Sequence, residues 1–210
     1  MQTGAIILCG GKSSRMGRDK ATLPFGPELM LPRTIRLLSE VVDPGKIVVV
    51  AAIDQQLPPL PQPVIVARDQ HPSRGPLEGI AAGLEAIPRG VEAVYVTSCD
   101  VPLLVPAFVT RMFELLEDFD IAVPWEGEQF HPLSAVYRPT VAGMARQLVQ
   151  ADKRRVRFLF DDARTRRVGI DQLRLVDPEL QTLMNLNHRE DYQAALKIAG
   201  FSETSDTSIP

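Results

Sequence analysis

The chain has 210 residues, 45% of them hydrophobic, which suits one domain of ordinary to large size with a substantial buried core. Its formal net charge of −3 gives no overall footprint for nucleic acid, because proteins that bind nucleic acid usually carry a basic excess. Two cysteines far apart in the sequence indicate neither a disulfide framework nor a zinc site, and no apolar stretch approaches the ~18 residues of a membrane span. Residues 1–11 also lack the basic start of a signal peptide, so we expect a cytoplasmic protein with no membrane or nucleic-acid partner.

The first part of the chain alternates short apolar runs with helical patterns. The runs that read as buried strands are 5–8, 46–52, 64–66, 91–97 and 121–123. The helical patterns between them cover 32–42, 77–87 and 106–116. Continuous apolar runs are typical of parallel strands, because helices cover both faces of such a sheet. The alternation predicts an α/β protein with three layers in a Rossmann-like arrangement, in which a mostly parallel twisted sheet carries helices on both faces.

After about residue 125 the pattern loosens. Residues 131–138 read as a further strand, 141–149 and 155–160 as helices, 167–170 as a short strand and 189–199 as a final helix. We therefore predict a single domain over residues 1–200. Residues 201–210 are expected to form a disordered tail because their composition is polar.

A glycine-rich loop, LCGGKSSRMGRDK at 8–20, follows the first predicted strand. Its letters GKS match the end of the pattern G-x-x-x-x-G-K-[ST], but the first glycine would fall at Ile6, which excludes a Walker A loop. The adjacent Gly10 and Gly11 do not fit the dinucleotide fingerprint G-x-G-x-x-G either. Paired glycines still let backbone N–H groups approach an anion, and Lys12, Arg15 and later Lys20 add positive charge nearby.

Polar residues also follow the other predicted strands, where ligands of open parallel sheets bind. Asp69 lies shortly after the third predicted strand, and Asp100 lies shortly after the fourth. A lone carboxylate facing a cationic phosphate loop favours a bridging Mg²⁺, which binds one or two carboxylates together with phosphate oxygens. The alternative is that Asp100 caps a turn before Pro102. We prefer the metal role because the loop 8–20 lies opposite.

The loop 8–20 closely resembles the L-x-G-G-x-S-x-R-M-G-x-D-K signature of nucleotidyltransferases, specifically of the molybdenum cofactor guanylyltransferase family. Further segments resemble that family in order along the chain: GPLEG at 75–79, CDVP at 99–102, HPL at 131–133 and NLN at 185–187. The resemblance spans nearly the whole predicted domain. It implies a nucleotide-diphospho-sugar transferase-like fold, with Mg²⁺ as cofactor.

The implied reaction is transfer of GMP from GTP to the phosphate of molybdenum-bound molybdopterin, with release of pyrophosphate. GTP and molybdopterin would be the small-molecule substrates, and molybdoenzymes or their chaperones would be transient contacts. By similarity, Arg15, Lys20 and Asp100 would be catalytic, with Asp100 on the metal; Leu8, Cys9, Gly10, Gly11, Lys20, Asp69, Gly75, Pro76 and Asp100 would bind the nucleotide; and His131, Asn185 and Asn187 would line the pterin side. A phosphomonoester nucleophile is already an anion near neutral pH, so the reaction needs no strong general base.

Several positions keep a second interpretation. His131 could be only a strand-start residue, because it precedes a proline, and Trp125, expected just after the fifth strand, could stack on a pterin or cap the core. The glycines at 79 and 83 are expected to allow close helix packing rather than to touch a ligand. The segment 146–167 carries a net charge of +5, from eight Lys or Arg against three Asp, and could be a solvated face or steer an anionic substrate.

Two other function classes compete with the guanylyltransferase hypothesis. A molybdopterin cytidylyltransferase or a sugar-phosphate nucleotidyltransferase would share the fold, and Ala51 stands where the guanylyltransferases commonly place an asparagine. A non-catalytic molybdopterin- or nucleotide-binding chaperone would bind without releasing pyrophosphate. Both cysteines come just past the end of a predicted strand, so we expect Cys9 and Cys99 to lie side by side near the floor of the nucleotide site.

Overall fold

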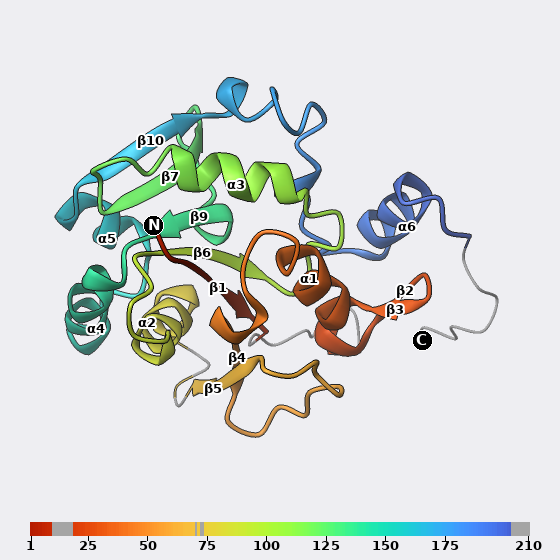
Figure 1. Cartoon of the computed structure of the whole chain (residues 1–210), viewed down its shortest axis with the longest axis horizontal. Helices are drawn as coiled ribbons and strands as arrows, with labels where there is room; N and C mark the ends of the chain where they lie inside the picture. Colours follow the sequence, from red (N-terminus) through yellow and green to blue (C-terminus); the bar gives the residue numbers. More distant parts are fainter. Residues whose placement is uncertain (10–18, 70, 72–73, 203–210) are drawn as a thin grey trace.

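The computed structural model describes residues 1–9, 19–69, 71 and 74–202, and Figure 1 shows the course of the chain. Within these residues the centre is an eight-stranded sheet in the order β10-β7-β9-β6-β1-β4-β5, with β8 paired to β7. Its strands are β1 (Thr3–Leu8), β4 (Ile47–Ala52), β5 (Ile65–Asp69), β6 (Ala93–Ser98), β7 (Ile121–Glu126), β8 (Gln129–Phe130), β9 (Ala135–Tyr137) and β10 (Thr165–Gly169). Neighbours pair in parallel except where β9 meets β6 and β7 and where β8 meets β7.

Helices cover both faces of this sheet (Figure 1). One face packs α1 (Met30–Leu38) and α3 (Pro106–Glu114), and the other packs α2 (Pro76–Ala86), α4 (Ala142–Gln150) and α5 (Arg157–Asp162). Short 3₁₀ turns join these elements: η1 (Lys20–Thr22), η2 (Pro44–Lys46), η3 (Pro132–Ser134), η4 (Pro139–Val141), η5 (Ile170–Gln172) and η6 (Gln181–Leu183). The predicted three-layer α/β architecture with a mostly parallel sheet is confirmed.

The strand β1 lies at the centre of the sheet because its side chains are apolar on both faces. Ala5 and Ile7 join the core under α1 and α3, whereas Ile6 and Leu8 join the core under α2. A Cβ on Gly83 would lie 2.7 Å from Ile6 Cγ2, so only glycine lets α2 approach this closely. A Cβ on Gly79 would lie 3.2 Å from Leu8 Cδ2, so both helical glycines face β1 where α2 packs closely on the sheet.

The order of the central strands gathers the polar strand ends on one edge of the sheet. In β1, Leu8 is in register with Val50 of β4 on one side and with Ser98 of β6 on the other. The strands β4 and β6 lie on opposite sides of β1 in the sheet. The carboxyl end of β1 is therefore the topological switch point, where ligands of such folds bind.

A smaller core lies beside the sheet and was not predicted. It joins the hairpin of β2 (Pro24–Phe25) and β3 (Glu28–Leu29) to α6 (Arg189–Ile198), which stands apart from the other helices in Figure 1. Phe25 makes edge contacts with Tyr192 and with Phe201. The structure thus places Phe201, which the sequence assigned to the tail, against this core, while residues 203–210 lie outside the described residues.

Several predicted boundaries were wrong. The expected strand 131–138 is only β9, because Pro132 begins the 3₁₀ turn η3 ahead of it. The first helix starts and ends earlier than 32–42, and β10 covers 165–169 rather than 167–170. Trp125 lies within β7, not after it. Val66, expected to be buried, is 42% exposed because β5 is an edge strand.

None of the helices in the described ranges is long and apolar enough to cross a membrane.

Candidate active site at the carboxyl ends of the central strands

Three segments far apart in the sequence meet at the carboxyl ends of β1 and β6. The Lys20 ammonium lies 2.6 Å from Asp100 Oδ2 and donates to Asn187 Oδ1 at 3.2 Å. The Ser98 hydroxyl donates to Asp100 Oδ1. The carboxylate and the ammonium are partly buried, with side chains 13% and 18% exposed. Of the residues predicted for the site, the structure therefore brings Lys20, Asp100 and Asn187 together, and it adds Ser98.

The segment that carries Asn187 is held in place by hydrogen bonds of its backbone amides. The Leu186 amide donates to the Asp100 carbonyl at 3.1 Å, which ties the segment before α6 to the strand end. The amides of Asn187 and His188 donate to Asp191 Oδ2, so α6 begins with its first turn capped at the site. Leu186 is buried while Asn185 and Asn187 on either side are exposed.

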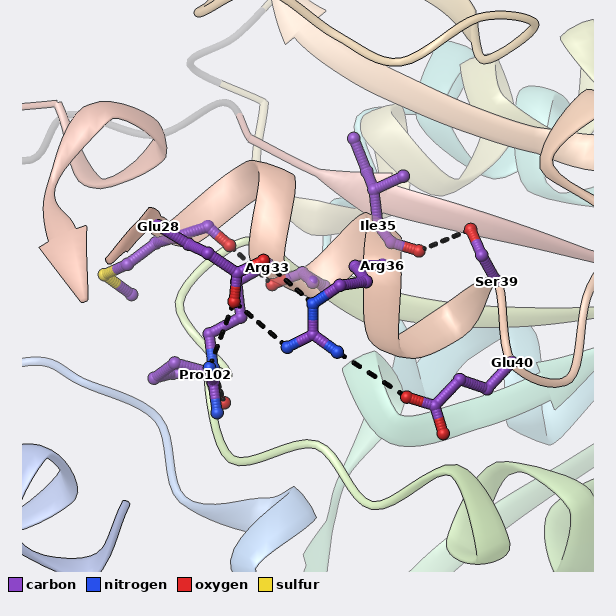
Figure 2. A network of polar contacts seen from close by, with 9 residues as sticks. Glu28, Arg33, Ile35, Arg36, Ser39, Glu40 and Pro102 are labelled. Atoms are coloured by element: carbon purple, nitrogen blue, oxygen red, sulfur yellow. Dashed lines mark hydrogen bonds and ion pairs between the residues drawn. The ribbon is translucent and has the colours of Figure 1, made fainter. Parts of the chain in front are cut away.

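The chain after Asp100 is clamped from α1. Arg33 Nε donates to the Pro102 carbonyl at 2.8 Å, and its guanidinium lies over the rings of Phe25 and Phe201 at 5.0 and 5.6 Å. In Figure 2 the Glu28 carboxylate lies between this guanidinium and that of Arg36. The Arg36 hydrogen bond holds the pKa of Glu28 below its usual value. Sequence reasoning missed Arg33, since nothing local marks an arginine on α1 as a partner of a loop 69 residues away.

A second cluster lies at the end of β5 and the start of α2. Asp69 is buried, and its Oδ1 accepts from the His71 amide at 2.7 Å. Burial raises the pKa of Asp69, and the neighbouring Glu78 carboxylate adds to this. Gly75, with φ of +84°, turns the chain into α2, which starts at Pro76. Predicted nucleotide-binding positions 69, 75 and 76 thus lie close in the chain around one strand-to-helix turn.

Glu78 on α2 is a buried carboxylate that the sequence reading did not single out. Arg146 of α4 lies 2.7 Å from its Oε1, and His71 Nδ1 lies 3.7 Å from the same oxygen. The other oxygen, Oε2, has no hydrogen-bond partner among the described residues. The charge of Glu78 is therefore balanced mainly by Arg146, which also pairs with Glu85.

His131 opens the 3₁₀ turn η3, and its amide donates to the Pro124 carbonyl at 3.1 Å. Its Nε2 is buried without a hydrogen-bond partner in the described part of the chain. Burial lowers the pKa of His131 below its usual value, so the imidazole is neutral at pH 7. No hydrogen bond or ion pair among the described residues joins it to the Lys20–Asp100–Asn187 cluster.

The two cysteines lie side by side, as expected. Each follows its strand, and the Cys99 amide donates to the Leu8 carbonyl at 3.1 Å. Both are buried free thiols. A hydrogen bond with Cys99, together with burial, raises the pKa of the Cys9 thiol. The predicted positions Gly10, Gly11, Lys12 and Arg15 lie outside the described residues.

Four of the eight basic residues in the segment 146–167 form ion pairs with acids among the described residues. Its ion pairs are Arg146 with Glu78 and Glu85, Arg154 with Asp152, Arg164 with Asp118, and Arg166 with Glu117. Arg167 lies over the Trp125 ring at 4.6 Å, and Phe130 packs edge-on against the same ring. These contacts favour a structural role for the segment and for Trp125.

The described side chains at this site offer fixed charges and hydrogen-bonding groups. No group of three or more His, Cys, Asp or Glu that could hold a metal occurs in the described ranges. A single carboxylate, Asp100, stands beside a partly buried ammonium, and the Asn187 side-chain amide accepts a hydrogen bond from that ammonium. Such a site can align anions and stabilise developing negative charge, and the described residues include no evident pair of nucleophile and base there.

Comparison with known proteins places these observations in a family. Residues 5–168 match the family model described as "MobA-like NTP transferase domain". A protein of Mycobacterium avium (strain 104) named "Probable molybdenum cofactor guanylyltransferase" is 35% identical over 199 residues, covering 92% of this chain and 95% of that one. A protein of the same name from Mycobacterium tuberculosis (strain ATCC 25618 / H37Rv) is 34% identical over 197 residues, covering 91% and 92%.

Solved structures show the same fold. Molybdopterin-guanine dinucleotide biosynthesis protein A from Archaeoglobus fulgidus superposes with a TM-score of 0.77 at 20% identity, covering 95% of this chain and 99% of that one. The 2-C-methyl-D-erythritol 4-phosphate cytidylyltransferase from Thermus thermophilus gives a TM-score of 0.70 at 15% identity, covering 95% and 100%. The nucleotide-diphospho-sugar transferase-like fold implied by the sequence motifs is therefore confirmed.

Proposed function

The chain belongs to the MobA-like NTP transferase family and is a nucleotidyltransferase, and from this we propose that it transfers GMP from GTP to the phosphate of molybdenum-bound molybdopterin, releasing pyrophosphate. The observation that carries the proposal is the meeting of Lys20, Asp100 and Asn187 at the carboxyl ends of β1 and β6. These residues come from three of the five segments whose motifs resemble the guanylyltransferases. The relatives that cover nearly the whole chain carry that name, which supports GTP as the nucleotide.

The reaction joins two anions, and the side chains present suit that task. The molybdopterin phosphate is a nucleophile without help from a base, because a phosphomonoester loses its second proton near pH 6. What remains is to hold two negative groups in line and to stabilise charge on the leaving pyrophosphate. Lys20 supplies a positive charge that is already oriented by Asp100 and Asn187. An oriented, partly buried charge acts in the transition state without having to reorganise.

The donor set fits a magnesium ion as cofactor. Mg²⁺ binds through one or two carboxylates and takes its other ligands from substrate phosphates and water, so a single carboxylate suffices. Asp100 accepts one hydrogen bond on each oxygen, from Lys20 and from Ser98, and each oxygen has acceptor capacity left. In this proposal Asp100 holds the ion, whose charge supplies Lewis-acid stabilisation of the phosphate oxygens.

The two substrates would approach from different sides of this cluster. We assign the nucleoside to the side of Leu8, Cys9 and the buried Asp69 at the end of β5. The pterin is assigned to His131, Asn185 and Asn187, where the exposed amide side chains and a neutral imidazole offer donors and acceptors without charge. Asn187 would then link the two sides, since it bonds Lys20 directly.

The test is pyrophosphate release from GTP, with CTP as the competing nucleotide, in the presence of molybdopterin and Mg²⁺. We expect release from GTP, and an Asp100→Asn variant that folds normally but has lost turnover, because an amide lacks the charge that holds a divalent ion. Asp54→Asn, at an exposed position, is the matched control and should retain activity. Release from CTP alone would contradict the assigned base, and binding of both substrates without release would indicate a carrier.

A further inference from the structure

Gln55 lies in the turn after β4, and its side chain contacts both described residues that flank positions 10–18. Its Nε2 donates to the Cys9 carbonyl at 3.0 Å and to Asp19 Oδ2 at 2.6 Å. Its Oε1 accepts from the Ala52 amide at 3.1 Å. The side-chain amide thus uses both N–H donors and its oxygen at once, and one residue joins the two ends of the glycine-rich segment.

The turn that carries Gln55 is itself fixed to the sheet. The Gln55 amide donates to the Ala52 carbonyl at 3.1 Å, which closes the turn. Arg68 of the neighbouring strand β5 donates through Nη1 to the carbonyls of Ala52 and Gln55, at 3.0 and 2.8 Å. Gln55 therefore projects from a braced turn rather than from a free loop.

The contact with Asp19 reaches the candidate active site in one further step. The other oxygen of this carboxylate, Oδ1, accepts from the Ala21 amide at 2.9 Å and caps η1. Lys20 is the first residue of η1, and its ammonium contacts Asp100. A shift of Asp19 would therefore move the start of η1 and with it the Lys20 side chain.

We propose that Gln55 is a positioning residue for nucleotidyl transfer, which sets the separation of Cys9 and Asp19 and so orients Lys20 toward Asp100. The proposal rests on the proposed function for what Lys20 binds. It does not require Gln55 to touch substrate. A residue that only filled space in the turn would not need an amide donor facing a carbonyl and a carboxylate together.

The first test replaces the side-chain donor by an acceptor without changing the size of the side chain. Gln55→Glu keeps an oxygen for the Ala52 amide but sets a second oxygen against the Cys9 carbonyl and the Asp19 carboxylate. We expect kcat/KM for GTP to fall at least about ten-fold. Gln56→Glu makes the same substitution at the next, exposed residue and should stay within about two-fold of wild type. Equal activity of Gln55→Glu and wild type would overturn the proposal.

A second test separates positioning from general loss of stability. In an Asp19→Asn background the new amide can donate to the carboxylate introduced at position 55 while its oxygen still caps η1, so donor and acceptor exchange places. In the Asp19→Asn protein, Gln55→Glu should then lower kcat/KM by about three-fold or less. In the protein with the native Asp19, the same substitution should lower it by about ten-fold. The same loss on both backgrounds would show that the bond between residues 19 and 55 does not carry the effect.

Amide hydrogen exchange gives a readout that does not depend on the substrate. Gln55→Glu should speed exchange in peptides that contain the Ala21 amide, and Gln56→Glu should leave it unchanged. Unchanged exchange in Gln55→Glu would overturn the positioning role even if activity fell. If the wild-type protein transfers no nucleotide but exchange responds as expected, the proposed function fails while the structural link from Gln55 to Asp19 stands.

Discussion

Removing Arg146 should destabilise the protein strongly, because it leaves the buried Glu78 carboxylate without its main partner. Glu78 lies on α2 with its side chain 3% exposed, and Arg146 reaches it from α4 at 2.7 Å. No partner for Glu78 Oε2 occurs among the described residues, and His71 is 3.7 Å from Oε1. Arg146→Met keeps most of the length of the side chain and removes only the charge and its donors.

The expected loss in the free energy of unfolding is about 3 kcal/mol. Breaking a buried ion pair from one side costs about 3–5 kcal/mol, because the remaining charge is uncompensated. We take the lower end because the Arg146 side chain is 28% exposed, so water can approach the position that the guanidinium leaves. Replacing both residues, with Glu78→Leu added to Arg146→Met, should recover most of the loss, since no buried charge is then left unpaired.

Urea unfolding at pH 7, followed by circular dichroism, measures these differences from the midpoint and slope. Arg154→Met is the matched control, because its pair with Asp152 is exposed, at 51% and 71%, and should contribute no more than about 0.5 kcal/mol. A loss below about 1 kcal/mol for Arg146→Met, with an unchanged slope, would refute the reasoning. So would a double variant no more stable than the single one.

Three further predictions concern the site and its support. Lys20→Ala should cost about 2–4 kcal/mol of transition-state stabilisation, and an unchanged kcat/KM would remove it from the site. Because the folded pKa of Asp69 is raised, its favourable contribution is present at acid pH and is lost as the pH rises through that pKa. Asp69→Asn should therefore raise the urea midpoint at pH 7, with a smaller gain near pH 4.5, while weakening nucleotide binding. Gly83→Ala should lower the melting temperature because its Cβ meets β1, whereas Gly143→Ala, in open space on α4, should raise it.

Much of the fold could be predicted from the sequence because the patterns that mark its main strands and helices each lie within a few consecutive residues. The apolar run before Cys9 and the one before Asp100 have the length and continuity of buried parallel strands, and the structure has them as β1 and β6. The side-by-side position of Cys9 and Cys99 followed from the rule that ligand sites form where the strand order reverses. The hairpin β2–β3 was not predicted, because strands of two residues are too short to show a periodic pattern.

The site itself needed the tertiary structure. Lys20 and Asp100 are 80 positions apart, and Lys20 and Asn187 are 167 apart, so no local pattern states that they touch. Asn187 was named only through resemblance to a family, whereas Lys20 and Asp100 were also singled out by their positions after predicted strands. Arg33, Gln55 and Arg146 had no motif at all, because an arginine or glutamine on a helix or turn reads as solvated until its partner is known. The sequence by itself determined the alternation of the main strands and helices, since those preferences act between near neighbours. Only the packing of α1, α4 and the β4 turn against the sheet decided which charges became buried, paired and oriented.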